Sequence, residues 1–194
     1  MLFLFGCKSE QKTSFGPNPL SLVPDSLALQ DADLICRCGN TWYSSYFRKV
    51  ISKQKLFSHI GILTRDSIDG ELHVYHMEED ESLHHHGMVK ESLADFLSHS
   101  SQFGIYRVMM NEELRHKVVE MSNELLLRRL SFDSSFSDNS EQSLYCTEYV
   151  AFIFNSLNID RIYPTLKLPG RTLYSLDDII YQTHASCLMI SPKY

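Results

Sequence analysis

A cysteine stands at the start of an apolar helical segment late in the chain. The segment Leu144-Tyr145-Cys146-Thr147-Glu148 runs into the apolar residues 149–154, and Ser143 is the expected N-cap. Backbone N–H groups point outward in the first turn of a helix and favour an anion there. We therefore expect the helix start, together with a neighbouring imidazole, to lower the pKa of the Cys146 thiol and make it a nucleophile.

Two histidines upstream are the candidate partners of this thiol. His59 opens the strand-like run Ser58-His59-Ile60-Gly61-Ile62, and His76 ends a second such run, 17 residues on. Asp69-Gly70 between them is a tight-hairpin signal, so the two strands are expected to pair. His59 is then the expected general base and His76 the group that fixes its tautomer. His73 competes with His76, but on a strand the two face opposite ways.

The remaining pattern predicts an α+β fold, in which a small, mostly antiparallel sheet packs against helices on one face. The expected strands are residues 33–37, 58–64, 71–77, 103–109 and 187–190, and the expected helices are residues 41–53, 89–98, 111–130, 143–154 and 176–181. Asn111 is the expected N-cap of the long helix. This layering allows a thiol on a helix to face imidazoles on strands.

Bulk composition narrows the function classes. The 194 residues are enough for one domain with a real core, and the net charge of −6 offers no basic field for nucleic acid. The apolar runs stay shorter than the roughly 18 residues of a membrane span.

The N-terminus is similar to the end of a bacterial lipoprotein signal peptide. Residues 1–6 are apolar and stop at Cys7, the expected lipidation site, before a polar stretch. We expect a lipoprotein-like segment and tether over residues 1–24 and a hydrolase domain over residues 25–194. A cytoplasmic protein remains the alternative if the signal is accidental.

Other cysteines and histidines receive a structural interpretation. Cys36 and Cys38 share one face of a predicted strand and are expected to be packed residues, because their spacing is too short for a zinc knuckle. The run His84-His85-His86 is expected to be a solvated loop, since three consecutive histidines do not converge on one ion. We therefore expect no metal site.

With these motifs in place, the chain resembles the permuted papain-like amidases of the YiiX/YaeF type, within the NlpC/p60 superfamily. Usual members of the superfamily place the cysteine helix before the strand motifs. Here the strand motifs come first, as Ala32-Asp33-Leu34-Ile35, then Ser58 to Ile62, then Val74-Tyr75-His76, and the cysteine motif 144–148 comes last. Some relatives have a carboxylate at the position of His76, which leaves the third member open.

The resemblance implies a circularly permuted papain-like fold and attack on an amide or ester carbonyl. Cys146, His59 and His76 would be catalytic, while Tyr145, Glu148 and Ser58 would contact the substrate. An acyl-enzyme would form on Cys146, its oxyanion held by the Cys146 N–H and one further donor, without a metal or organic cofactor. The expected partner is a small amide or peptide, such as one from the cell wall.

Two other functions stay open. Relatives of the lecithin–retinol acyltransferase kind use the same strand-then-cysteine order. The aromatic residues Trp42, Tyr43, Tyr46 and Phe47 could line an acyl channel, although core packing is the favoured explanation for them. A non-catalytic envelope binding lipoprotein is the third hypothesis.

Overall fold

The protein is an α+β fold built on one antiparallel sheet. The structure, a computed structural model, describes residues 18–39, 48–49, 55–80, 85–136 and 142–194. Six strands form the main sheet in the order β10-β5-β1-β2-β3-β4, and every pair in it is antiparallel. Their bounds are β1 Leu34–Gly39, β2 His59–Arg65, β3 Leu72–Asp80, β4 His85–Ser92, β5 Ser100–Arg107 and β10 Ser186–Ile190.

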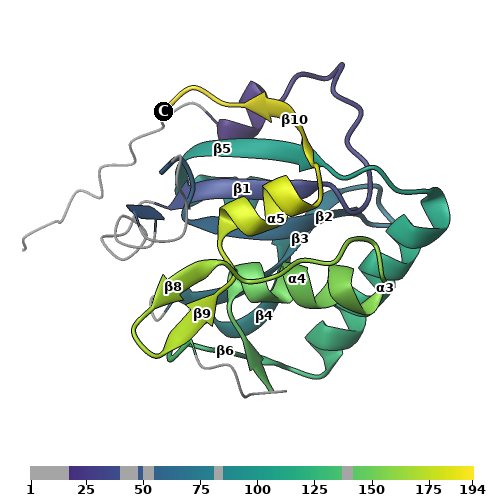
Figure 1. Cartoon of the computed structure of the whole chain (residues 1–194). Coiled ribbons are helices and arrows are strands. Elements are labelled where there is room, and N and C mark those ends of the chain that lie inside the picture. Colours follow the sequence, from purple (N-terminus) through teal and green to yellow (C-terminus); the bar gives the residue numbers. More distant parts are fainter. Residues whose placement is uncertain (1–17, 40–47, 50–54, 81–84, 137–141) are drawn as a thin grey trace, which may run out of the picture.

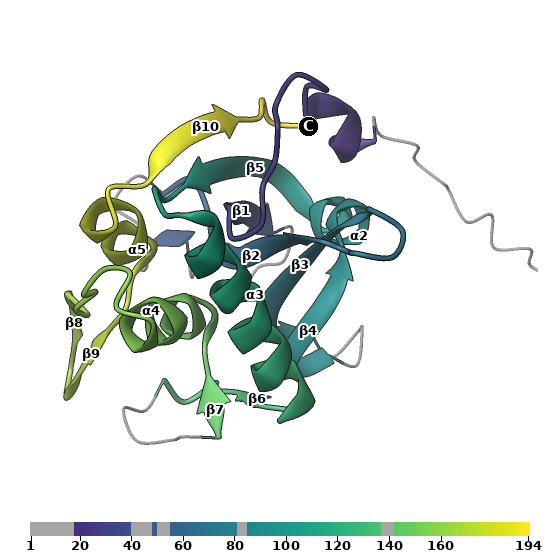
Figure 2. The same cartoon turned by 90° about the vertical axis from the view of Figure 1, so that its right-hand side faces the viewer.

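The helices cover both faces of this sheet, whereas the sequence predicted helices on one face only. Their bounds are η1 Pro19–Leu22, α2 Leu93–Ser98, α3 Glu112–Leu127, α4 Cys146–Ser156 and α5 Leu176–Gln182. The strands form an arc with α3 and α4 on its concave side and α2 on its convex side (Figures 1 and 2). The prediction failed because the strands are buried on both faces, and such strands give no alternating pattern.

Two hydrophobic cores follow from this layering. The larger one lies between the sheet and helices α3, α4 and α5, and includes Ile60, Tyr75, Met77 and Cys146. The smaller one lies under α2 and includes Ile35, Leu63, Val74 and Phe96. Alternate residues of each strand serve different cores, so β1 and β2 are buried along almost their whole length.

Most predicted elements are confirmed. Asn111 caps α3 by accepting a hydrogen bond from the Leu114 N–H at 2.9 Å. The predicted helix over residues 89–98 is wrong in its first half, because residues 89–92 end strand β4 and only α2 is helical. Most of the helix predicted over residues 41–53 lies outside the described residues.

Further short elements complete the chain. Strands β6 Ser131–Phe132 and β7 Ser143–Leu144 form a parallel pair, and β8 Leu166–Leu168 and β9 Arg171–Leu173 form a hairpin. Leu20 and Leu22 of η1 pack against the smaller core, so the folded part includes residues within the predicted 1–24 tether. Among the described residues, no helix is long and apolar enough to cross a membrane.

A buried carboxylate ties the start of β1 to the end of β5. The Asp33 side chain is fully buried and accepts hydrogen bonds from Arg107 Nε and Nη2 at 2.7 and 2.6 Å. Arg115 of α3 lies 3.8 Å from the same carboxylate. Asp33 therefore ties β1 to β5 and to α3, and its role in the Ala32-Asp33-Leu34-Ile35 motif is structural.

Candidate active site

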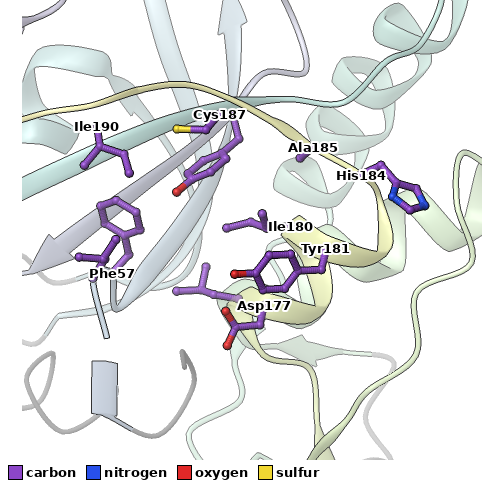
Figure 3. A pocket seen from close by; sticks show the side chains of 11 residues that line it. Phe57, Asp177, Ile180, Tyr181, His184, Ala185, Cys187 and Ile190 are labelled. Atoms are coloured by element: carbon purple, nitrogen blue, oxygen red, sulfur yellow. The ribbon is translucent and has the colours of Figure 1, made fainter. Parts of the chain in front are cut away.

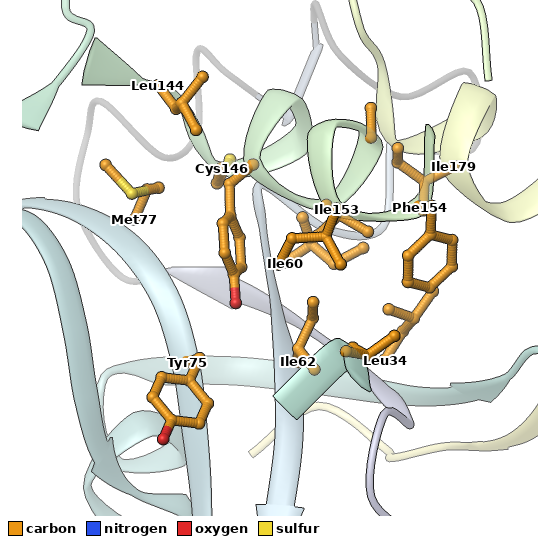
Figure 4. Packing of buried hydrophobic residues seen from close by; sticks show 14 of the residues in the cluster. Leu34, Ile60, Ile62, Tyr75, Met77, Leu144, Cys146, Ile153, Phe154 and Ile179 are labelled. Carbon is orange, nitrogen blue, oxygen red and sulfur yellow. The ribbon is translucent and has the colours of Figure 1, made fainter. Parts of the chain in front are cut away.

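Cys146 is the first residue of α4, and Tyr145, rather than the predicted Ser143, is the N-cap. The helix rests on β2 and β3, and Figure 4 shows the Cys146 side chain beside Met77, Leu144 and Ile60. Backbone N–H groups of Ile60, Thr147 and Cys146 itself lie near enough to the sulfur to act on the thiol pKa, and all three lower it. Since the Ile60 N–H belongs to the peptide that joins His59 to Ile60, the sulfur lies against the backbone of His59.

Burial dominates the acidity of this thiol. Cys146 is 4% exposed, and burial raises its pKa to about 12, although the three N–H groups act in the opposite direction. The expectation that the helix start lowers the thiol pKa is therefore wrong for the free protein. Removing an anion from water outweighs the helix N-terminus here.

His59 and His76 meet across the β2–β3 pair, as predicted. His59 Nε2 lies 2.9 Å from His76 Nδ1, and both rings contact Phe96 of α2. Burial lowers the pKa of His59 well below its usual value, and Arg37 and His76 act in the same direction against Glu78. His73 pairs instead with Thr64 and Ser92, so it does not compete with His76.

The thiol and the histidine pair approach the end of the β2–β3 ladder from opposite faces. Cys146 belongs to the core on the α4 side, whereas the histidine rings lie on the α2 side. The ladder begins with Gly61 opposite His76, so the Ile60 N–H lies at its open end. The structure thus brings His59 and His76 into direct contact, whereas Cys146 lies near the His59 backbone on the other face of the ladder.

Gly61 makes the close approach of the two strands possible. A Cβ atom at this position would lie 2.5 Å from Val74 Cγ1, 2.9 Å from the Tyr75 carbonyl oxygen and 3.1 Å from His76 Cβ. These distances are shorter than van der Waals contacts, so only glycine fits. The sequence argument that a backbone approaches closely at Gly61 is confirmed, and the backbone is that of β3.

Three charged residues surround His76, and sequence reasoning gave none of them a role in the site. Glu91 Oε1 lies 2.9 Å from His76 Nε2, and Glu78 Oε2 lies 3.8 Å from His76 Nδ1. Arg37 forms an ion pair with Glu78 and lies 3.7 Å from Glu91. Glu91 could have been found from the sequence, because it and His76 face the same side of neighbouring strands once β4 is recognised as a strand.

The three predicted substrate contacts have structural bonds. The Tyr145 hydroxyl accepts a hydrogen bond from the Tyr174 N–H at 2.7 Å, and Glu148 accepts one from the Tyr145 N–H at 3.4 Å. The Ser58 hydroxyl accepts the Gly39 N–H at 3.0 Å. These bonds hold the start of α4 and the ends of β1 and β2 in place.

The remaining cysteines and histidines agree with their structural interpretation in part. Cys36, Cys38, Cys146 and Cys187 are all free thiols, and Cys36 and Cys38 are buried. Cys7 and His84 lie outside the described residues. His85 and His86 are not in a loop as predicted, because both belong to β4.

One group of side chains has the composition of a metal site. Ligand atoms of His59, His76 and Glu78 all lie within 4.8 Å of one another, and imidazole and carboxylate suit zinc. However, the Arg37 guanidinium is bound to the Glu78 carboxylate and places a positive charge in the same cluster. A cation would have to displace Arg37 or bear its repulsion, so the residues fit a metal poorly.

A pocket of about 420 Å³ opens near the same core. Its lining is mainly apolar and comes from α5, β10 and the segment before β2 (Figure 3). Phe57, two residues before His59, lies on its wall, and Tyr106 and Asp177 add polar groups. The four aromatic residues predicted for an acyl channel, Trp42, Tyr43, Tyr46 and Phe47, lie outside the described residues.

Comparisons with known proteins agree with this architecture. Residues 29–189 match the model of a family described as permuted papain-like amidase enzymes, the YaeF/YiiX or C92 family. The fold is similar to the crystal structure of YiiX from Escherichia coli O157:H7, titled a metalloprotein, with a TM-score of 0.64 and 15% identity over 85% of this chain and 98% of that one. Among curated protein sequences, none matches this chain significantly.

Proposed function

This chain belongs to the YaeF/YiiX, or C92, family of permuted papain-like amidases, and on that premise we propose that it hydrolyses amide bonds through Cys146, His59 and His76. At the level of the family it is a cysteine-type hydrolase with a papain-like fold. The observation that carries the proposal is the convergence of the thiol on the His59 backbone and of His59 on His76.

The proposed reaction starts from a neutral pair. Because burial raises the pKa of Cys146 and lowers that of His59, the proton stays on sulfur in the resting protein. As Sγ attacks the carbonyl carbon, the proposed proton transfer runs from Sγ to His59 Nδ1, the ring nitrogen that the bond to His76 does not use. This transfer requires the imidazole to reach the α4 side around the open end of the β2–β3 ladder. His59 therefore acts as a general base during the attack.

The helix start supports the charge that develops. The oxygen of the attacked carbonyl becomes an anion, and the N–H groups of Cys146 and Thr147 are the proposed donors to it. His59 then gives its proton to the leaving amine, and an acyl group remains on Sγ. Water, activated by the same imidazole, releases the acid and restores the thiol.

The proposed substrate is a small amide or peptide from the bacterial cell wall. The family resemblance to amidases and the lipobox-like residues before Cys7 support a protein anchored in the envelope through a lipid on Cys7. Expression of the full chain in a bacterium with Cys7→Ser as the comparison tests this: the wild type should partition with membranes and the variant should not. Equal partition contradicts the anchor.

The decisive experiment is hydrolysis of cell-wall peptides by the purified protein, followed by mass spectrometry. Cys146→Ala should abolish turnover, while Cys187→Ala, a change at an exposed free thiol, should leave it intact. Turnover that persists in Cys146→Ala contradicts the proposal.

A lipid acyltransferase or thiol lipase is the second candidate. The mainly apolar pocket of about 420 Å³ beside Phe57 favours it, because such a pocket would accept part of an acyl chain. Phospholipid incubated with the same protein would then yield a free fatty acid or an acylated amine. If lipid turns over and peptides do not, acyl chemistry replaces the amidase proposal.

A further inference from the structure

We infer that Glu91 is a positioning residue that sets the protonation of His59 through His76. The Glu91 Oε1 atom lies 2.9 Å from His76 Nε2, the ring nitrogen on the far side from His59. The inference rests on the proposed function of Cys146 and His59, but it makes a separate statement about which ring nitrogens carry hydrogen.

The Glu91 carboxylate determines which nitrogen of His76 carries hydrogen. A carboxylate only accepts hydrogen bonds, and a bare ring nitrogen also presents a lone pair. The Glu91 oxygen lies 2.9 Å from Nε2 but off the axis of a hydrogen bond, so the choice of nitrogen depends on charge: a negative carboxylate beside a bare nitrogen lone pair is unfavourable in a buried site, because little water screens the repulsion. Therefore a neutral His76 carries its hydrogen on Nε2, and its Nδ1 has the lone pair.

The tautomer of His76 determines the tautomer of His59. His76 Nδ1 and His59 Nε2 are 2.9 Å apart, and one hydrogen must lie between them. Since His76 Nδ1 has the lone pair, His59 Nε2 carries the hydrogen. In a neutral imidazole the other nitrogen is then bare, so His59 Nδ1 is the basic atom.

The opposite arrangement would disable the base. If Glu91 did not hold the hydrogen on His76 Nε2, His76 could donate from Nδ1, and His59 would carry its hydrogen on Nδ1. That nitrogen could not then accept the thiol proton. Glu91 thus acts through the His76 ring against the inactive tautomer, in which His59 carries its hydrogen on Nδ1.

The other charged groups of the cluster do not replace Glu91. Glu78 lies 3.8 Å from His76 Nδ1, beyond hydrogen-bond distance, and its carboxylate is bound to Arg37. Arg37 also donates to the Phe96 carbonyl oxygen at 2.8 Å and lies 3.7 Å from Glu91, where it compensates part of the carboxylate charge. Of the two carboxylates, Glu91 is the one beside His76 Nε2, at an ion-pair distance of 2.9 Å.

The test is the tautomeric state of both histidines in the full protein, read by two-bond ¹H–¹⁵N NMR correlation with ¹⁵N-histidine. His59→Gln and His76→Gln samples assign the signals. At neutral pH the wild type should show hydrogen on Nε2 and a bare Nδ1 for both residues. Hydrogen on Nδ1 of either residue overturns the inference, and this result needs no variant of Glu91 to fold.

Variants extend the test to function. Glu91→Leu should give mixed tautomers at His59 and lower kcat about 10²- to 10⁴-fold with little change in KM, which is the range for losing a correctly placed base. Glu79→Leu, on the same sheet but directed to the other face, is the matched control and should keep the wild-type tautomers. Unchanged tautomers in Glu91→Leu contradict the inference. Absence of hydrolysis in the wild type contradicts the proposed function and leaves the tautomer result standing.

Discussion

His59 Nε2 lies 2.9 Å from His76 Nδ1, and the two rings meet edge to face at an interplanar angle of 90°. The contact joins the start of β2 to the middle of β3, and both rings are covered by Phe96. The pair is therefore fixed by strand register and by packing from α2. Each of these supports can be removed separately.

Gly61→Ala should separate the histidine pair. Its methyl group would overlap Val74 Cγ1 and the Tyr75 carbonyl oxygen, and overpacking of this kind costs about 1–3 kcal/mol. Hydrolytic activity should fall by more than tenfold, measured beside the urea unfolding midpoint. The double variant Gly61→Ala/Val74→Ala removes the shortest overlap and should recover part of the stability. Full activity in Gly61→Ala would show that the close approach of β3 is not needed.

Alkylation of Cys146 should be slow at neutral pH and should rise steeply in alkaline solution. Burial raises the pKa of this thiol to about 12, so few molecules carry the thiolate at pH 7. Iodoacetamide labelling followed by peptide mass spectrometry measures each cysteine in one sample, and the exposed Cys187 should react first. Rapid labelling of Cys146 below pH 7, lost in His59→Ala, would instead show a preformed thiolate–imidazolium pair.

The protein should lose stability as the pH falls below about 6.5. Burial lowers the pKa of His59 in the folded state below its usual value of 6.5. At pH values above 6.5, His59 is therefore neutral in both the folded and the unfolded chain, and the lowered pKa does not change the stability. Below that value the unfolded chain binds a proton that the folded chain does not. The free energy of unfolding then falls by up to about 1.4 kcal/mol per pH unit.

Urea unfolding at pH 7.5 and pH 5.5 measures this loss. His59→Gln, which cannot bind the proton, should lose less stability between the two values than the wild type. His116→Gln, a change at an exposed histidine on α3, is the control and should behave as the wild type. An equal loss in wild type and His59→Gln would mean that other groups cause the acid sensitivity.

Asp33→Asn should destabilise the fold by about 3–5 kcal/mol, because it leaves the Arg107 guanidinium without its buried partner. Glu113→Gln provides the contrast, since Glu113 pairs with Lys117 on the exposed face of α3. An exposed pair contributes little to stability, because water screens its charges. Chemical unfolding of the two variants checks the difference, and similar losses would contradict the structural role of Asp33.

Removal of metal ions should leave the hydrolase active. Arg37 is ion-paired with Glu78, so the wild type should bind Zn²⁺ weakly, and EDTA should not reduce turnover. Arg37→Gln frees the carboxylate and should bind Zn²⁺ more tightly by calorimetry, with Arg65→Gln, a change at an exposed arginine, as the control. Loss of wild-type turnover in EDTA, restored by Zn²⁺, would show that the cluster holds a metal.

The amino-acid sequence by itself determined the elements that carry the site and their order along the chain. The Asp69-Gly70 turn and the alternating run 71–77 predicted the β2–β3 hairpin, and the hairpin brings His59 to His76. The apolar run after Cys146 predicted α4. These features depend on neighbours in the sequence, where periodicity and turn chemistry act directly.

The tertiary structure alone decided which residues surround those elements. Glu91 reaches His76 only because β4 pairs with β3, and residues 89–92 have no local pattern that distinguishes this strand from the start of a helix. The pKa of Cys146 depends on how deeply the start of α4 is buried. Burial raises this pKa, and its effect exceeds the lowering that was expected from the helix start. How deeply a side chain is buried and which distant strands pair depend on contacts made across the whole fold. A short window of sequence therefore cannot predict either of them.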